Sequence, residues 1–62
     1  MNTEMLRREF EGILALEERA KHFYDHYISQ VDNEKIKRQL TAIRDDEIRH
    51  IKIAKTLIAF VS

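Results

Sequence analysis

Apolar residues recur in both halves of the chain at alternating steps of three and four, and charge interrupts each series near its middle. In the first half these positions are Leu6, Phe10, Ile13, Glu17, Ala20, Tyr24, Tyr27 and Val31. In the second half they are Ile36, Leu40, Ile43, Glu47, His50, Ala54, Leu57 and Val61. This spacing is typical of a helix whose apolar stripe packs against partners. The pattern predicts two amphipathic helices, with Glu17, Glu47 and His50 projecting from the middle of their apolar stripes.

The break between the two periodic stretches lies in the polar cluster 29–33, in a chain with no proline and a single glycine. We therefore expect one helix over about 4–30, a turn at about 31–33 and a second helix over about 34–60. A short turn between two long helices favours an antiparallel hairpin. The fold class is all-α, and 1–62 forms a single domain.

Glu17 and Glu47 are equally far from the expected turn, so their carboxylates should face each other in a hairpin. Glu47 and His50 are three residues apart and share one helix face. Unpaired charges at these positions would cost several kcal/mol, on the order of the penalty for burying an ion. Two hairpins paired about a twofold axis would form a four-helix bundle with four carboxylates and two imidazoles in its central layer. Carboxylate-bridged dinuclear metal sites use this ligand set, and two divalent cations would balance its charge.

Composition limits the other functions open to the chain. With 62 residues it can enclose little core alone, so we expect a homodimer, with a higher homo-oligomer left open. Its 11 basic and 11 acidic residues give no net charge, which argues against nucleic acid or an anionic membrane as partner. Cysteine is absent, so any metal is bound through oxygen and nitrogen. No apolar run has the length of a membrane span or a signal peptide, and a cytoplasmic protein is expected.

Three further groups of residues need an interpretation. Tyr24, two helical turns after Glu17, is either a hydrogen-bonding or redox-active neighbour of the site or an ordinary aromatic of the stripe. His22 and His26 are four residues apart but lie off the stripe, and we interpret them as an exposed pair without function. Asp45 and Asp46 are interpreted as exposed charge rather than metal ligands.

The residues of the predicted site also resemble a known family. Glu17 followed by Phe23-Tyr24-Asp25, and then Asp45-Asp46-Glu47-x-x-His50, is similar to the ferritin-like superfamily and most closely to the encapsulated ferritins. The resemblance covers about 14–57. It implies a hairpin that dimerises into a ferritin-like four-helix bundle, with a di-iron ferroxidase site across the dimer interface. By this resemblance Glu17, Glu47 and His50 are the iron ligands, and Tyr24 is the nearby tyrosine.

The chain departs from the family pattern in two respects. Leu16 and Arg19 flank the first ligand where family members carry further carboxylates, and Glu18 is the one acid left nearby. The resemblance therefore does not predict the route by which iron would reach the site in this chain. The family often ends in a peptide that docks to an encapsulin shell, and no such peptide is seen here. An encapsulin compartment thus stands as an alternative location that the resemblance alone suggests.

The function that we expect is oxidation of Fe(II) to Fe(III), by dioxygen or peroxide, at a di-iron site shared across a homodimer. The ligand types also admit manganese and zinc. One alternative is a metal-free hairpin that acts as an oligomerisation or protein-binding module, in which Glu47 pairs with His50 and Glu17 is protonated. The other is a structural site where zinc or manganese locks the dimer without turnover.

Overall fold

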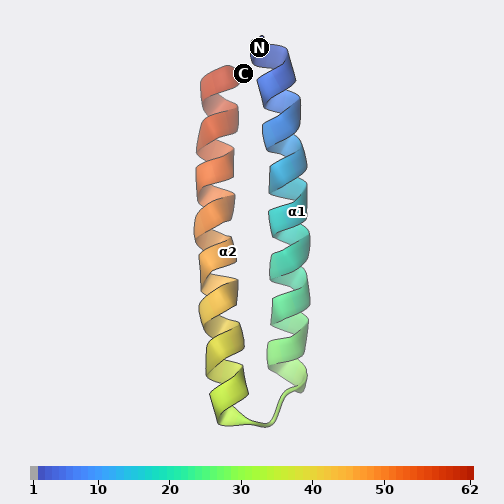
Figure 1. Ribbon diagram of the computed structural model, residues 1–62, viewed down its shortest axis with the longest axis vertical. Helices are drawn as coiled ribbons and strands as arrows, with labels where there is room; N and C mark the ends of the chain where they lie inside the picture. Colours follow the sequence, from blue (N-terminus) through green and yellow to red (C-terminus); the bar gives the residue numbers. More distant parts are fainter. Residues whose placement is uncertain (1) are drawn as a thin grey trace.

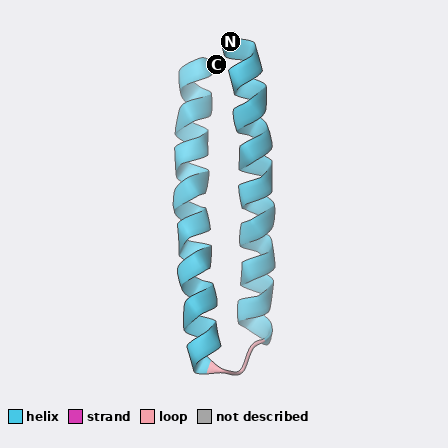
Figure 2. Cartoon of the chain, viewed as in Figure 1, coloured by secondary structure: helices cyan, strands magenta, loops and turns pink. Residues whose placement is uncertain are grey.

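Two long helices make up nearly all of the chain that the structure describes. The computed structural model describes residues 2–62, in which helix α1 (Thr3–Gln30) is followed by helix α2 (Glu34–Val61). The helices run antiparallel, side by side, and the two termini lie at the same end (Figure 1). The hairpin measures 47 × 14 × 14 Å, and residues 2–62 contain no strand. The prediction of an all-α hairpin is confirmed; Figure 2 shows the short loop that joins the helices.

Asparagine side chains determine where both helices begin. The side chain of Asn2 accepts a hydrogen bond from the backbone N–H of Met5 at 2.7 Å, and Asn33 accepts one from Ile36 at 3.0 Å. Each bond satisfies a donor that the first helical turn leaves free, which stabilises a helix by about 1 kcal/mol. At Val31 the backbone becomes extended and α1 ends. The position of the turn is therefore determined by local backbone chemistry.

The hairpin by itself buries very little. Among residues 2–62 only Ala54 is buried, with 4% of its surface exposed. The apolar side chains between the helices are half-buried: Leu6, Phe10, Leu14, Tyr24, Ile28, Val31, Leu40, Ile48, Ile51, Ile58 and Val61. The apolar residues of each helix extend over more than two rows of side chains around its circumference. A single neighbouring helix covers only part of such a surface, so each helix has room for a second packing partner. The hairpin thus does not complete a core.

One side of the hairpin keeps its apolar residues exposed. Five positions of the predicted stripes are not covered by the other helix, namely Ile13, Tyr27, Ile36, Ile43 and Leu57, with 39% to 52% of their surface exposed. Leu16, Phe23, Ile53 and Phe60 extend this exposed set. We call these nine residues the apolar face. Charged residues are interspersed along both helices, and within 2–62 neither helix has an apolar stretch long enough to cross a bilayer.

Candidate metal centre

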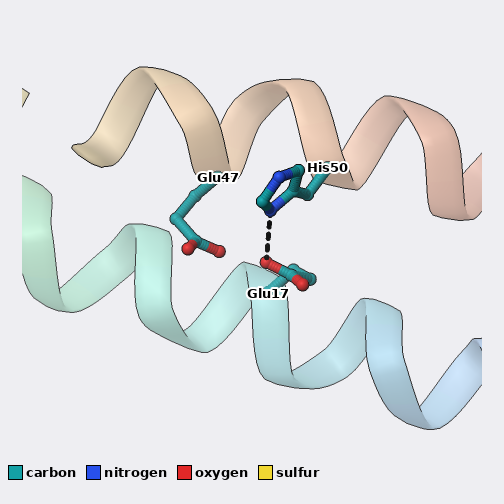
Figure 3. Close-up of side chains that lie close together, drawn as sticks. All are labelled: Glu17, Glu47 and His50. Atoms are coloured by element: carbon teal, nitrogen blue, oxygen red, sulfur yellow. Dashed lines mark ion pairs between the residues drawn. The ribbon is translucent and has the colours of Figure 1, made fainter. Parts of the chain in front are cut away.

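Three side chains that can bind a metal ion meet halfway along the hairpin. Glu17 comes from the middle of α1, while Glu47 and His50 come from successive turns of α2. Each offers a ligand atom, and these atoms lie within 4.8 Å of one another. Figure 3 shows the three side chains directed into the space between the helices. In the part of the chain that the structure describes, this is the one group of three or more potential metal-binding side chains.

The imidazole of His50 is closest to Glu17. His50 Nδ1 lies 3.5 Å from Glu17 Oε2, and this contact is an ion pair when the imidazole is protonated (Figure 3). About half of the His50 side chain is exposed, against 23% of the Glu17 side chain. In the metal-free alternative we expected His50 to pair with Glu47, and that expectation is wrong. The imidazole approaches the carboxylate on the opposite helix.

Of the three side chains, Glu47 has the surroundings that least favour its charged form. Its Oε2 atom is buried and has no hydrogen-bond partner. The pKa of Glu47 is raised above its ordinary value of 4.5, first because its protonated form hydrogen-bonds to Glu17 and then because burial removes solvent. The negative charge of Glu17 adds to this effect, and the charge of His50 opposes it. An ionised Glu47 therefore lacks a positive neighbour close enough to offset its burial, which a bound cation would provide.

The cluster opens toward the apolar face. A hollow beside it is lined by Glu17 and His50 together with the apolar residues Ile13, Ile53, Ala54 and Leu57. Ile13, Ile53 and Leu57 belong to the apolar face, so the ligands lie at the border between the helix interface and this uncovered side. Anything that covers the apolar face would also close the site.

The other residues singled out from the sequence lie away from the cluster. Tyr24 is half-buried on α1 and lines a separate hollow with Phe23 and Tyr27; it is not one of the three clustered ligand groups. His22 and His26 are exposed. Asp45 and Asp46 are exposed as well, and they pair with the arginines Arg44 and Arg49 at 3.1 and 2.6 Å, respectively.

Sequence reasoning missed a polar contact that joins the two helices near the cluster. Arg44 Nη1 donates a hydrogen bond to Asp25 Oδ1 at 2.7 Å, with 27% and 35% of the two side chains exposed. Lys21 Nζ donates to the other carboxylate oxygen of Asp25, also at 2.7 Å. These two donors hold the pKa of Asp25 below its ordinary value. The two partners are 19 residues apart and lie beside the apolar stripes, so their spacing in the sequence did not reveal the contact.

Comparisons with known proteins do not place the chain in a family. No family model matches it, and no curated protein or solved structure is significantly similar to it.

Proposed function

We propose that the chain is a di-iron ferroxidase, active as a homodimer, in which Glu17, Glu47 and His50 of each copy bind Fe(II) and support its oxidation to Fe(III). The observation that carries this proposal is that Glu17, Glu47 and His50 offer ligand atoms within 4.8 Å of one another, and that one oxygen of this group, the buried Glu47 Oε2, has no partner. The resemblance to the encapsulated ferritins points to the same residues and the same chemistry.

The donor set suits iron. Two carboxylates and one imidazole per chain are ligands that Fe(II), Mn(II) and Zn(II) accept, and carboxylate oxygens favour the higher charge of Fe(III). In a dimer, four carboxylates would balance two divalent cations. Binding would give Glu47 Oε2 the positive neighbour that it lacks, and it would compete with the protonation of Glu47 that a raised pKa favours.

The apolar face favours a second copy of the hairpin as the partner. Within residues 2–62 one residue is buried, whereas ten large apolar residues are exposed, nine of them in the apolar face. Such a hairpin gains most from packing this face against another apolar surface. A twofold axis through the face would join two hairpins into a four-helix bundle. It would also bring the second set of ligands to the open side of the first. Dimerisation and completion of the site are thus one event in this proposal.

Fe(II) is the substrate as well as the bound ion. Two Fe(II) ions give up one electron each, and dioxygen accepts both electrons and two protons to become hydrogen peroxide. If hydrogen peroxide is the oxidant, it accepts two electrons and two protons to become two molecules of water. The chain holds the two ions together and stabilises the added positive charge with its carboxylates. Glu47, whose pKa is raised by Glu17 and by burial, is suited to exchange a proton as the charge of the site changes.

The test is an anaerobic titration of the metal-free protein with Fe(II), with the molecular mass followed in solution and the absorbance recorded when air is admitted. We expect dimers at one iron per chain and an oxo-ferric absorption band after oxidation. Glu47→Ala should abolish both, whereas Glu18→Ala, which removes an exposed carboxylate beside Glu17, should preserve them. A stable dimer that takes up no iron and leaves oxygen untouched would refute the proposal.

A second function is favoured by the way the cluster can compensate itself without metal. The His50–Glu17 contact and a protonated Glu47 would leave no net charge in the group, and the apolar face would serve as the docking surface. The chain would then be a helical oligomerisation or protein-binding module. In that case Glu17→Gln leaves stability unchanged or raises it, whereas the ferroxidase proposal requires that it weaken iron binding. The remaining alternative is a structural site in which zinc or manganese stabilises the dimer and no oxygen is consumed.

A further inference from the structure

Three polar contacts join α1 to α2 within residues 2–62. Two of them lie in the metal-binding group, namely the His50–Glu17 contact and the hydrogen bond that protonated Glu47 makes to Glu17. The third is the Arg44–Asp25 pair. A cation bound by Glu17, Glu47 and His50 would take the atoms that form the first two contacts. The Arg44–Asp25 pair is therefore the one polar link that can persist with and without metal.

The geometry around this pair is restrictive. Asp25 receives a hydrogen bond on each carboxylate oxygen, from Arg44 Nη1 and from Lys21 Nζ, both at 2.7 Å. The guanidinium is held in turn by a second bond, from Arg44 Nε to Asp45 Oδ1 at 3.1 Å. The pKa of Arg44 is raised by its hydrogen bond to Asp25 and then by the one to Asp45. Charge-assisted hydrogen bonds from a planar guanidinium constrain direction as well as distance.

The apolar contacts between the helices cannot impose the same constraint. They involve half-buried side chains, and Ala54 is the one buried residue in the part of the chain described. A slip of one residue moves a helix along its axis by about 1.5 Å. Ligand groups have to be held to within roughly 0.5 Å to keep a defined site. The relative position of Glu17 and Glu47 thus needs a directional link between the helices.

The pair is placed where it can act on the site. On α2, Arg44 precedes Glu47 by three residues, which is about one turn; on α1, Asp25 follows Glu17 by eight residues, which is about two turns. We propose that Arg44 and Asp25 are positioning residues, whose ion pair holds α1 and α2 in the register that brings Glu17 together with Glu47 and His50. This inference rests on the proposed metal site for its consequence, since the register decides how well that site is formed.

Co(II) binding tests this role, because the visible absorption of Co(II) reports its coordination and no turnover is needed. Arg44→Met should lower Co(II) affinity about 10-fold or more and shift the absorption band, as loss of an outer positioning group does. Arg49→Met is the matched control: Arg49 pairs with Asp46 within α2 and links no second helix. It should leave both readouts at wild-type values.

Asp25→Asn, which keeps the size of the side chain, provides a second test if Arg44→Met folds poorly. Asp25→Asn should lower affinity and shift the band in the same way, and the double variant should lose no more than either single one, because both remove one interaction. A variant that loses thermal stability but binds Co(II) with wild-type affinity and an unchanged band would reduce the pair to a structural contact and overturn the proposal.

Measurements on the metal-free protein test the positioning role independently of the proposed function. If the wild type binds no Co(II), the metal site itself fails, and the register is then read from nuclear Overhauser contacts between α1 and α2. Contacts between Glu17 and Glu47 that weaken in Arg44→Met but not in Arg49→Met would support the positioning role. Contacts that persist unchanged in both variants would refute it.

Discussion

His50 Nδ1 lies 3.5 Å from Glu17 Oε2 on the opposite helix, whereas Glu47, one turn before His50, has a buried Oε2 without a partner. The negative charges of the two carboxylates are therefore balanced in different ways. The charge of Glu17 can be balanced by the nearby imidazole of His50, whereas Glu47 requires a proton or a bound cation. This difference makes the protonation of Glu47 and the binding of a metal ion competing events.

Removal of the imidazole should abolish specific metal binding. In His50→Ala the cluster retains two carboxylates, and we expect affinity for Fe(II) or Co(II) to fall by more than the roughly 10- to 100-fold that loss of an outer hydrogen-bonding partner costs. His22→Ala removes an exposed imidazole from α1 and should leave affinity unchanged. Calorimetric titration under anaerobic conditions measures both. Equal losses in the two variants would show that metal binds nonspecifically to surface histidines.

The metal-free protein should lose stability as the pH rises through the titration of Glu47. Because its pKa is raised in the folded state, the folded chain binds more protons than the unfolded one above about pH 4.5. The free energy of unfolding contributed by Glu47 is therefore full below that pH and decreases until the raised pKa is passed. Denaturant unfolding at a series of pH values measures this slope.

Glu47→Gln is the control for that slope, since a neutral amide mimics the protonated acid and does not titrate. The difference between the wild-type and Glu47→Gln curves isolates Glu47 from Asp25, whose lowered pKa acts with the opposite sign and below about pH 3.8. Saturating metal should reverse the wild-type slope, because binding requires the ionised carboxylate. A wild-type curve parallel to that of Glu47→Gln would contradict the assignment.

A charge on the apolar face should separate the proposed dimer into monomers. Ile43 is 41% exposed in the hairpin, so Ile43→Lys places its ammonium in solvent in a monomer but within the core of a four-helix bundle. Thr56→Lys adds the same charge at an exposed position outside the apolar face and should preserve the dimer. Sedimentation equilibrium distinguishes the two. If Ile43→Lys dimerises like the wild type, the face is not the interface.

The space around Ala54 should tolerate no larger side chain. Ala54 is 4% exposed, so Ala54→Leu should destabilise the protein by about 1–3 kcal/mol through overpacking against the residues that bury it. Ala59→Leu makes the same change at an exposed position of α2 and should stay within about 0.5 kcal/mol of the wild type. Urea unfolding followed by circular dichroism compares them. Equal effects would mean that the helices do not pack closely at Ala54.

The hairpin could be predicted from the sequence because its determinants are local. Apolar spacing defines the two helices, and Asn33 supplies the cap that starts the second one after the break. The ligand group could also be found, since Glu17, Glu47 and His50 interrupt apolar stripes at matching distances from the turn. The Arg44–Asp25 pair could not, because it depends on side-chain reach across two helices rather than on periodicity.

The sequence by itself determined two amphipathic helices, their connection and the three polar groups at their centre, because each follows from spacing along the chain. Only the tertiary structure decided that His50 approaches Glu17 rather than Glu47 and that Glu47 Oε2 is left without a partner. These features depend on how two helical surfaces are rotated against each other. That rotation is a balance of many half-buried contacts, and spacing along one helix does not specify it.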